Sequence, residues 1–154
     1  MKSIDQWLSE YGESHQNPTN KMVHFVCVPV IFFTIVGLFY CIPPLFHISG
    51  HPITVAHVVL VFVTIYYALL SIPLSIGMFL YGVLCLLLCR LIQQATDGHL
   101  LLVSIGLFVL AWIAQFWGHN VEGKKPSFLK DIQYLMIGPA WIMSFLFKKI
   151  GLSV

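Results

Sequence analysis

MVHFVCVPVIFFTIVGLFYCI, residues 22–42, contains no Asp, Glu, Lys or Arg and decides the fold. It matches the length of roughly 20 apolar residues that a helix needs to cross the hydrocarbon core of a bilayer. The charge-free sequence continues to Arg90, and a second such stretch covers residues 98–121. Stretches this long and this apolar predict helices that span a membrane.

Composition supports the same fold class for the whole chain. Of the 154 residues, 58% are hydrophobic and 9% are charged, against about 25% charged in an ordinary soluble domain. A soluble core of this size cannot hide so much apolar surface. The chain is too short for two separate bundles, so we expect residues 1–154 to form a single membrane domain. The net charge of +2, with no basic run interleaved with aromatics, gives no sign of a nucleic-acid partner.

We expect an all-α integral membrane protein, a single bundle of four transmembrane helices with a fifth apolar segment. Asn17-Pro18 is typical of a helix start, because Asn caps well and Pro fits the first helical position. Ile4 to Tyr11 has the pattern of a short amphipathic helix, expected on the membrane surface. The fifth segment contains Gly138-Pro139, which predicts either a tilted span or a broken, re-entrant pair of half-helices. The expected segments are an interfacial segment 1–21, spans 22–42, 53–71, 74–92 and 100–117, a loop 118–131, and the last apolar segment 132–147.

The lysines predict the orientation of the chain. Four crossings before residue 118 place segment 1–21 and loop 118–131 on the same side of the membrane. The positive-inside rule makes this side cytoplasmic, in a bacterial inner membrane or the endoplasmic reticulum, whereas the opposite side has only Arg90 near a span end. The lysines on the predicted cytoplasmic side are Lys2, Lys21, Lys124, Lys125 and Lys130.

The same topology divides the seven histidines. His15, His24 and His119 are expected together at the cytoplasmic membrane boundary, and they are the candidate metal ligands. The others need no special role, because they fall in far-side loops or early in the second span; they are His47, His51, His57 and His99. The four cysteines lie in or beside apolar segments without paired metal spacing, and we interpret them as packing residues: Cys27, Cys41, Cys85 and Cys89.

A shared metal would satisfy His24, which lies about one turn inside its span, where an unpartnered polar side chain is costly. His15 precedes the break at Asn17-Pro18, so it can fold back over the entrance where His24 points inward. Three imidazoles suit iron, copper or zinc and leave positions open for a substrate or oxygen. The alternative is three unrelated interfacial histidines that only form hydrogen bonds.

Two more polar side chains follow the fourth span. If its helix continues, Gln115 and His119 share a face at four-residue spacing. Glu122 comes three residues after His119 on a nearby face and is a possible carboxylate ligand.

Two blocks of sequence are similar to a known family. YGESHQNPTNKMVH, residues 11–24, continues to Val28-Pro29, and WIAQFWGHNVEGKKP covers residues 112–126. Together they resemble the membrane 2-hydroxy fatty acid dioxygenases related to the yeast enzyme of phytosphingosine breakdown. The middle spans share only their apolar character with that family.

This resemblance implies an Fe(II)-dependent dioxygenase that uses O₂ to shorten 2-hydroxy long-chain fatty acids by one carbon (α-oxidation) in contact with membrane lipid. By position, His15, His24 and His119 look like catalytic, iron-binding histidines. Asn20 occupies a motif position and, with Gln115 and Glu122, is expected to support the ligands, Glu122 being also a weaker ligand candidate. The alternative is a noncatalytic transporter or assembly module with structural histidines.

Overall fold

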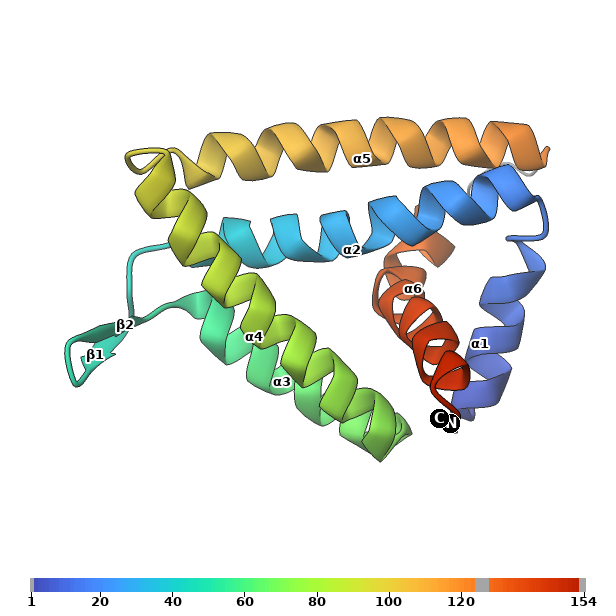
Figure 1. The fold of residues 1–154 in the computed structure, drawn as a ribbon, viewed down its shortest axis with the longest axis horizontal. Helices are drawn as coiled ribbons and strands as arrows, with labels where there is room; N and C mark the ends of the chain where they lie inside the picture. Colours follow the sequence, from blue (N-terminus) through green and yellow to red (C-terminus); the bar gives the residue numbers. More distant parts are fainter. Residues whose placement is uncertain (1, 124–127, 153–154) are drawn as a thin grey trace.

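The computed structural model describes residues 2–123 and 128–152, and this part of the chain is almost entirely helical. Figure 1 shows a long helix pair, a second hairpin that crosses it at an angle, and two helices at one end of the pair. The chain termini lie close together at that end. The elements are α1 (Ile4–Glu13), α2 (Pro18–Tyr40), β1 (Phe46–Ile48), β2 (His51–Ile53), α3 (Val55–Leu70), α4 (Ile72–Ala95), α5 (Leu100–Glu122) and α6 (Phe128–Lys149).

The expected break between α1 and α2 is present. Asn17 is the N-cap of α2, and its side-chain Oδ1 accepts a hydrogen bond from the Thr19 backbone N–H at 2.8 Å. Pro18 follows as the first helical residue, where its missing N–H costs nothing. The chain therefore turns sharply at residues 14–17, which places α1 across the end of α2 rather than in line with it (Figure 1).

Helices α2 and α5 run side by side in opposite directions along most of their length (Figure 1). Their contact is made by small and branched apolar side chains, including the buried Cys27, Ile31 and Ala111. Gly37 of α2 lies directly against Ser104 of α5, where a side chain on the glycine would collide with the serine. Close backbone approach through small residues is typical of helix packing in membranes.

Among the residues that the structure describes, three helices are long and apolar enough to cross a membrane: α2, α4 and α5. Helix α3 is apolar but shorter, and it is joined to α4 by the expected tight turn at Ser71, whose hydroxyl caps α4. Large apolar side chains stand exposed on these helices, among them Phe62, Leu80 and Leu110. Such surfaces fit lipid rather than water, so the structure agrees with an all-α membrane protein.

One expected boundary was wrong, and one of the two alternatives for the last apolar segment is ruled out. Helix α5 does not end at residue 117: residues 118–122, expected in a loop, remain helical until Gly123 ends the helix with φ of 74°. A left-handed glycine is a common helix terminator. The last segment is not broken at Gly138-Pro139, since α6 continues through both residues. The buried Ile137 and Trp141 hold α6 against the rest of the protein on either side of the proline.

Two further features differ from expectation. A small antiparallel hairpin, β1–β2, replaces part of the loop after the first span, and Ser49 and Gly50 both have positive φ in its turn. The apolar face of α1 is covered by α6 rather than free for the membrane surface, because Tyr11 is buried in one cluster with Ile137 and Trp141.

Candidate metal centre

The structure brings His15, His24 and His119 together at one end of the α2–α5 pair. His15 comes from the turn before α2, His24 from the second turn of α2, and His119 from the last turn of α5. One ring nitrogen from each lies within 4.8 Å of the other two. The ring centroids are 4.2 Å apart for His15 and His24, 4.8 Å for His24 and His119, and 5.6 Å for His15 and His119.

His15 is oriented by the helix that precedes it. Its Nδ1 lies 2.7 Å from the Tyr11 carbonyl oxygen, an acceptor, so Nδ1 must carry the proton and donate. The Nε2 atom then has a lone pair, and it is buried without a hydrogen-bond partner in the protein. Burial away from water lowers the pKa of His15 to about 4, which keeps the imidazole neutral near pH 7.

His24 is held in the same manner. Its Nδ1 lies 3.0 Å from the carbonyl oxygen of Asn20, one helical turn earlier, which again leaves Nε2 as the atom with a free lone pair. The side chain is only 2% exposed. His119 approaches from the facing helix and is half-buried, so the cluster is closed on the α2 side and more open on the α5 side.

These donors fit a transition-metal ion. Three atoms no more than 4.8 Å apart have a common centre within about 2.8 Å of each, so small side-chain adjustments reach the roughly 2.1 Å of a metal–imidazole bond. A buried Nε2 without a partner on His15 is the condition that a metal would relieve. Neutral imidazoles with a backbone acceptor on the other ring nitrogen are the usual form of histidine metal ligands.

Aromatic side chains cover His15. The Tyr11 ring stacks on it, with centroids 4.2 Å apart and planes at 13°, and Trp141 of α6 lies 5.5 Å from it. Tyr134 of α6 packs edge-on against Tyr11. From the sequence, Tyr11 was expected on the apolar face of the N-terminal helix and in a motif block, and no role at the site was predicted for Tyr11, Tyr134 or Trp141. The four-residue spacing of Tyr11 and His15 was a usable signal, whereas nothing in the sequence pairs α6 with α1.

Glu122 lies beside the cluster but outside the set of grouped ligand atoms. Its carboxylate accepts hydrogen bonds from the backbone N–H groups of Gln16 and Asn17, at 3.0 and 2.9 Å, and from Asn20 Nδ2 at 3.1 Å. Gln16 and Asn17 belong to the turn between α1 and α2, and Asn20 lies in the first turn of α2. The contacts favour the expected supporting role of Glu122 over the ligand role, since they tie the end of α5 to the segment that contains His15.

Asn20 connects the same parts from within α2. It is fully buried, its Nδ2 donates to the Ser14 carbonyl oxygen and to Glu122, and its own backbone carbonyl orients His24. Its Oδ1 faces the backbone of Gly118, where an added Cβ would come within 2.6 Å. Gly118 therefore allows α5 to approach α2 closely, one residue before His119. Gln115 is buried one turn earlier, on the His119 face of α5.

We expect Glu122→Gln to weaken metal binding by about 10- to 100-fold, the usual cost of losing a partner that orients metal ligands. The amide places an NH₂ group where two or more N–H donors converge, so at least one of these hydrogen bonds is lost. Titration against a competing chelator measures the affinity. Glu10→Gln is the matched control, because Glu10 forms only an exposed ion pair with Lys2 at 2.6 Å. Equal affinities for the two variants would contradict the supporting role.

The other histidines lie away from this cluster. His47 and His51 are exposed on the β1–β2 hairpin, His99 is exposed before α5, and His57 lies in the first turn of α3. The four cysteines are free thiols, and three of them are buried, in agreement with packing roles. Lys124 and Lys125 lie outside the described residues.

Comparison with known proteins agrees with the two motif blocks. The chain matches the family model described as 2-hydroxy-palmitic acid dioxygenase Mpo1-like over residues 1–150. It is 35% identical over 145 residues to the 2-hydroxy-palmitic acid dioxygenase MPO1 of Saccharomyces cerevisiae, an alignment that covers 92% of this chain and 78% of the yeast protein. No solved structure matches significantly. The resemblance is thus confirmed over nearly the full length, and the chain belongs to the Mpo1-like family.

Proposed function

We propose that this protein is an Fe(II)-dependent dioxygenase that shortens 2-hydroxy long-chain fatty acids by one carbon with O₂. The observation that carries the proposal is the convergence of three imidazole donors from distant parts of the chain, within 4.8 Å of one another. The yeast relative, named for 2-hydroxy-palmitic acid, supports the substrate class. Imidazole ligands with open positions suit iron.

The residues of the chain hold and shield the reacting groups. His15, His24 and His119 would bind the metal, and the carbonyls of Tyr11 and Asn20 fix the first two rings in the required tautomer. When bound, ferrous iron supplies O₂ activation and a site for the substrate's hydroxyl and carboxylate oxygens, bringing both reactants together. The α6 side chains over His15 exclude water from that side of the centre.

The surface beside the centre suits a lipid substrate. Phe116 of α5 is exposed three residues before His119, and residues at this spacing are neighbours on a helix surface. An acyl tail can lie against this apolar side chain while its polar head reaches the histidines. A membrane enzyme can thus take such a substrate directly from the bilayer.

We also propose a multi-pass topology with the metal centre on the cytoplasmic side of a bacterial inner membrane or the endoplasmic reticulum. Lys2 precedes α1 and Lys21 lies in the first turn of α2, two helices that meet at the end of the molecule that contains the centre. The β1–β2 hairpin and the C-terminal end of α4, which contains Arg90, are at the other end (Figure 1). The positive-inside rule assigns the lysine-rich end to the cytoplasm. Cysteine labelling from either side of sealed vesicles tests this orientation.

The decisive assay compares 2-hydroxypalmitate with palmitate, using purified protein with ferrous iron under air. We expect bound iron near one ion per chain, O₂ consumption, and a product one carbon shorter from the hydroxylated acid only, because palmitate lacks the oxygen that completes the chelate. Metal analysis and mass spectrometry provide both readouts. A noncatalytic module would show neither stoichiometric metal nor turnover, and that result would reject the proposal.

A further inference from the structure

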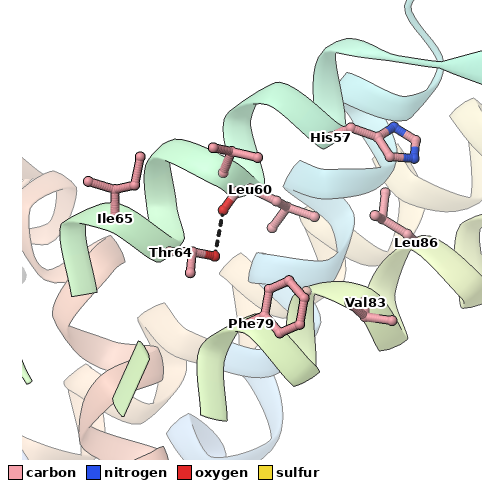
Figure 2. A pocket seen from close by; sticks show the side chains of 9 residues that line it. His57, Leu60, Thr64, Ile65, Phe79, Val83 and Leu86 are labelled. Carbon is pink, nitrogen blue, oxygen red and sulfur yellow. Dashed lines mark hydrogen bonds between the residues drawn. The ribbon is translucent and has the colours of Figure 1, made fainter. Parts of the chain in front are cut away.

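A second candidate site lies between α3 and α4, where an open groove of about 300 Å³ follows the two helices (Figure 2). This volume is at the lower end of the range for small-molecule sites. Leu60 and Gly82 are buried where the helices meet, and a Cβ on Gly82 would lie 3.0 Å from Leu60 Cδ2. Exposed side chains form the rim of the groove: Val61, Ile65, Phe79 and Val83.

The walls of this groove are apolar along its length. Thr64 is the one lining hydroxyl, and its Oγ1 donates to the Leu60 carbonyl oxygen at 2.8 Å (Figure 2, dashed line). The hydroxyl is thus satisfied within its own helix. Because lipid tails are as apolar as such walls, shape alone gives little selectivity for one lipid over another in a bilayer. Selectivity must come from polar groups at an end of the groove.

His57 supplies such a group at the end nearest the β1–β2 hairpin. The Thr54 backbone N–H donates to His57 Nδ1 at 3.1 Å, so Nδ1 is an acceptor and the proton of the neutral ring is on Nε2. Nε2 is therefore a hydrogen-bond donor on a side chain that lines the groove. A ligand that matches it has an acceptor, such as a carbonyl oxygen, at the head of an acyl chain.

Arg90 adds a positive charge at the same end. The groove-lining side chains of α4 include Phe79, Val83 and Leu86, and Arg90 follows Leu86 by four residues, hence on the same helix face. Arg90 also interacts electrostatically with Tyr40, whose ring lies 6.3 Å from that of His57. It is exposed and is the single Lys or Arg between Lys21 and Lys124 in the sequence.

We propose that this groove binds one anionic glycerophospholipid. One acyl chain lies between α3 and α4, an ester carbonyl accepts from His57 Nε2–H, and the phosphate pairs with Arg90. The α3–α4 hairpin crosses the α2–α5 pair away from the end where α1 meets α2 (Figure 1). The groove is therefore a lipid site separate from the proposed catalytic centre, placed to hold the α3–α4 hairpin.

Native mass spectrometry of the delipidated full-length protein tests this site, with phosphatidylglycerol and phosphatidylcholine of identical acyl chains as probes. We expect one tightly bound lipid and about a fivefold preference for phosphatidylglycerol, the typical effect of one basic residue on binding to a net anionic lipid. Both lipids have the phosphate, but phosphatidylcholine also places a positive choline group near Arg90. Arg90→Gln should abolish the preference, whereas Lys149→Gln, a charge change on α6, should keep it.

The apolar part of the site is tested by filling it. Val83→Trp places an indole in the groove and should weaken both lipids by at least about tenfold, since the acyl chain loses its space. Leu84→Trp on the same helix is the matched control, because Leu84 is exposed and does not line the groove. If Val83→Trp does not fold, His57→Leu probes the site through the lost donor and should weaken both lipids.

Three results would overturn the proposal. These are equal lipid binding by Val83→Trp and Leu84→Trp, a preference for phosphatidylglycerol that survives Arg90→Gln, and displacement of phosphatidylglycerol by equimolar palmitate, which would identify a fatty acid site instead.

Discussion

His24→Ala is expected to remove stoichiometric metal and to lower turnover of 2-hydroxy fatty acids by more than about 100-fold, since losing even an outer partner of a metal ligand costs 10- to 100-fold. His24 is 2% exposed and its ring lies between the other two, 4.2 Å from His15 and 4.8 Å from His119. Two remaining histidines cannot hold a metal in a three-ligand geometry. Metal analysis and the one-carbon shortening assay measure the two effects.

His99→Ala is the matched control for this variant. His99 is exposed before α5, and its Nδ1 contacts only the nearby Thr96 carbonyl oxygen, at 2.6 Å. We expect unchanged metal content and turnover. Wild-type turnover in His24→Ala would show that the histidine cluster is not the catalytic centre, even if the protein proved to be an oxygenase.

Gly118→Ala is expected to destabilise the protein by about 1–3 kcal/mol, the typical cost of forcing an extra methyl group into a packed contact. Its Cβ would lie 2.6 Å from Asn20 Oδ1 and 3.3 Å from Val23 Cγ1. Because α2 must move away from α5, we also expect metal affinity to fall by at least about tenfold. Thermal unfolding in detergent and chelator competition measure the two changes.

Gly106→Ala in the same helix should have the opposite effect. Nothing lies within 4 Å of the position of its Cβ, so alanine adds helix propensity, up to about 1 kcal/mol, without a collision. If Gly118→Ala had the same thermal stability and the same metal affinity as Gly106→Ala, the close approach of α2 and α5 at Gly118 would be contradicted.

The sequence alone predicts the histidine cluster to a useful extent, for two physical reasons. Asn17-Pro18 encodes a helix start through capping and the fixed φ of proline, so the chain had to turn between His15 and His24. Apolar stretches long enough to span a membrane alternate in direction, which places His119 at the same end as the N-terminal segment. The first inference uses the local preferences of Asn and Pro at a helix start. The second uses the number of membrane crossings between the two segments, since an even number returns the chain to the same side.

The remaining parts of the site depend on tertiary contacts that periodicity does not encode. The pattern of Ile4, Trp7 and Tyr11 predicts one apolar face on α1, but lipid and α6 would cover such a face equally well. The end of α5 was predicted too early, because His119 and Glu122 are polar and the hydropathy of the sequence therefore decreases several residues before the helix ends. Trp141 covers His15 because α6 packs against α1. No residue spacing in the sequence predicts that these two helices are in contact.

The main chain, not a side chain, holds the two buried imidazoles in position. His15 and His24 each contact, through Nδ1, the main-chain oxygen of the residue four positions earlier. A main-chain oxygen is present whatever the amino acid, so substitutions at those earlier positions leave this hold on the rings intact as long as the helix persists. This hold on each ring does not depend on the side chains of Tyr11 and Asn20, which make their own contacts at the site, whereas a proline that disrupts either turn would release the rings.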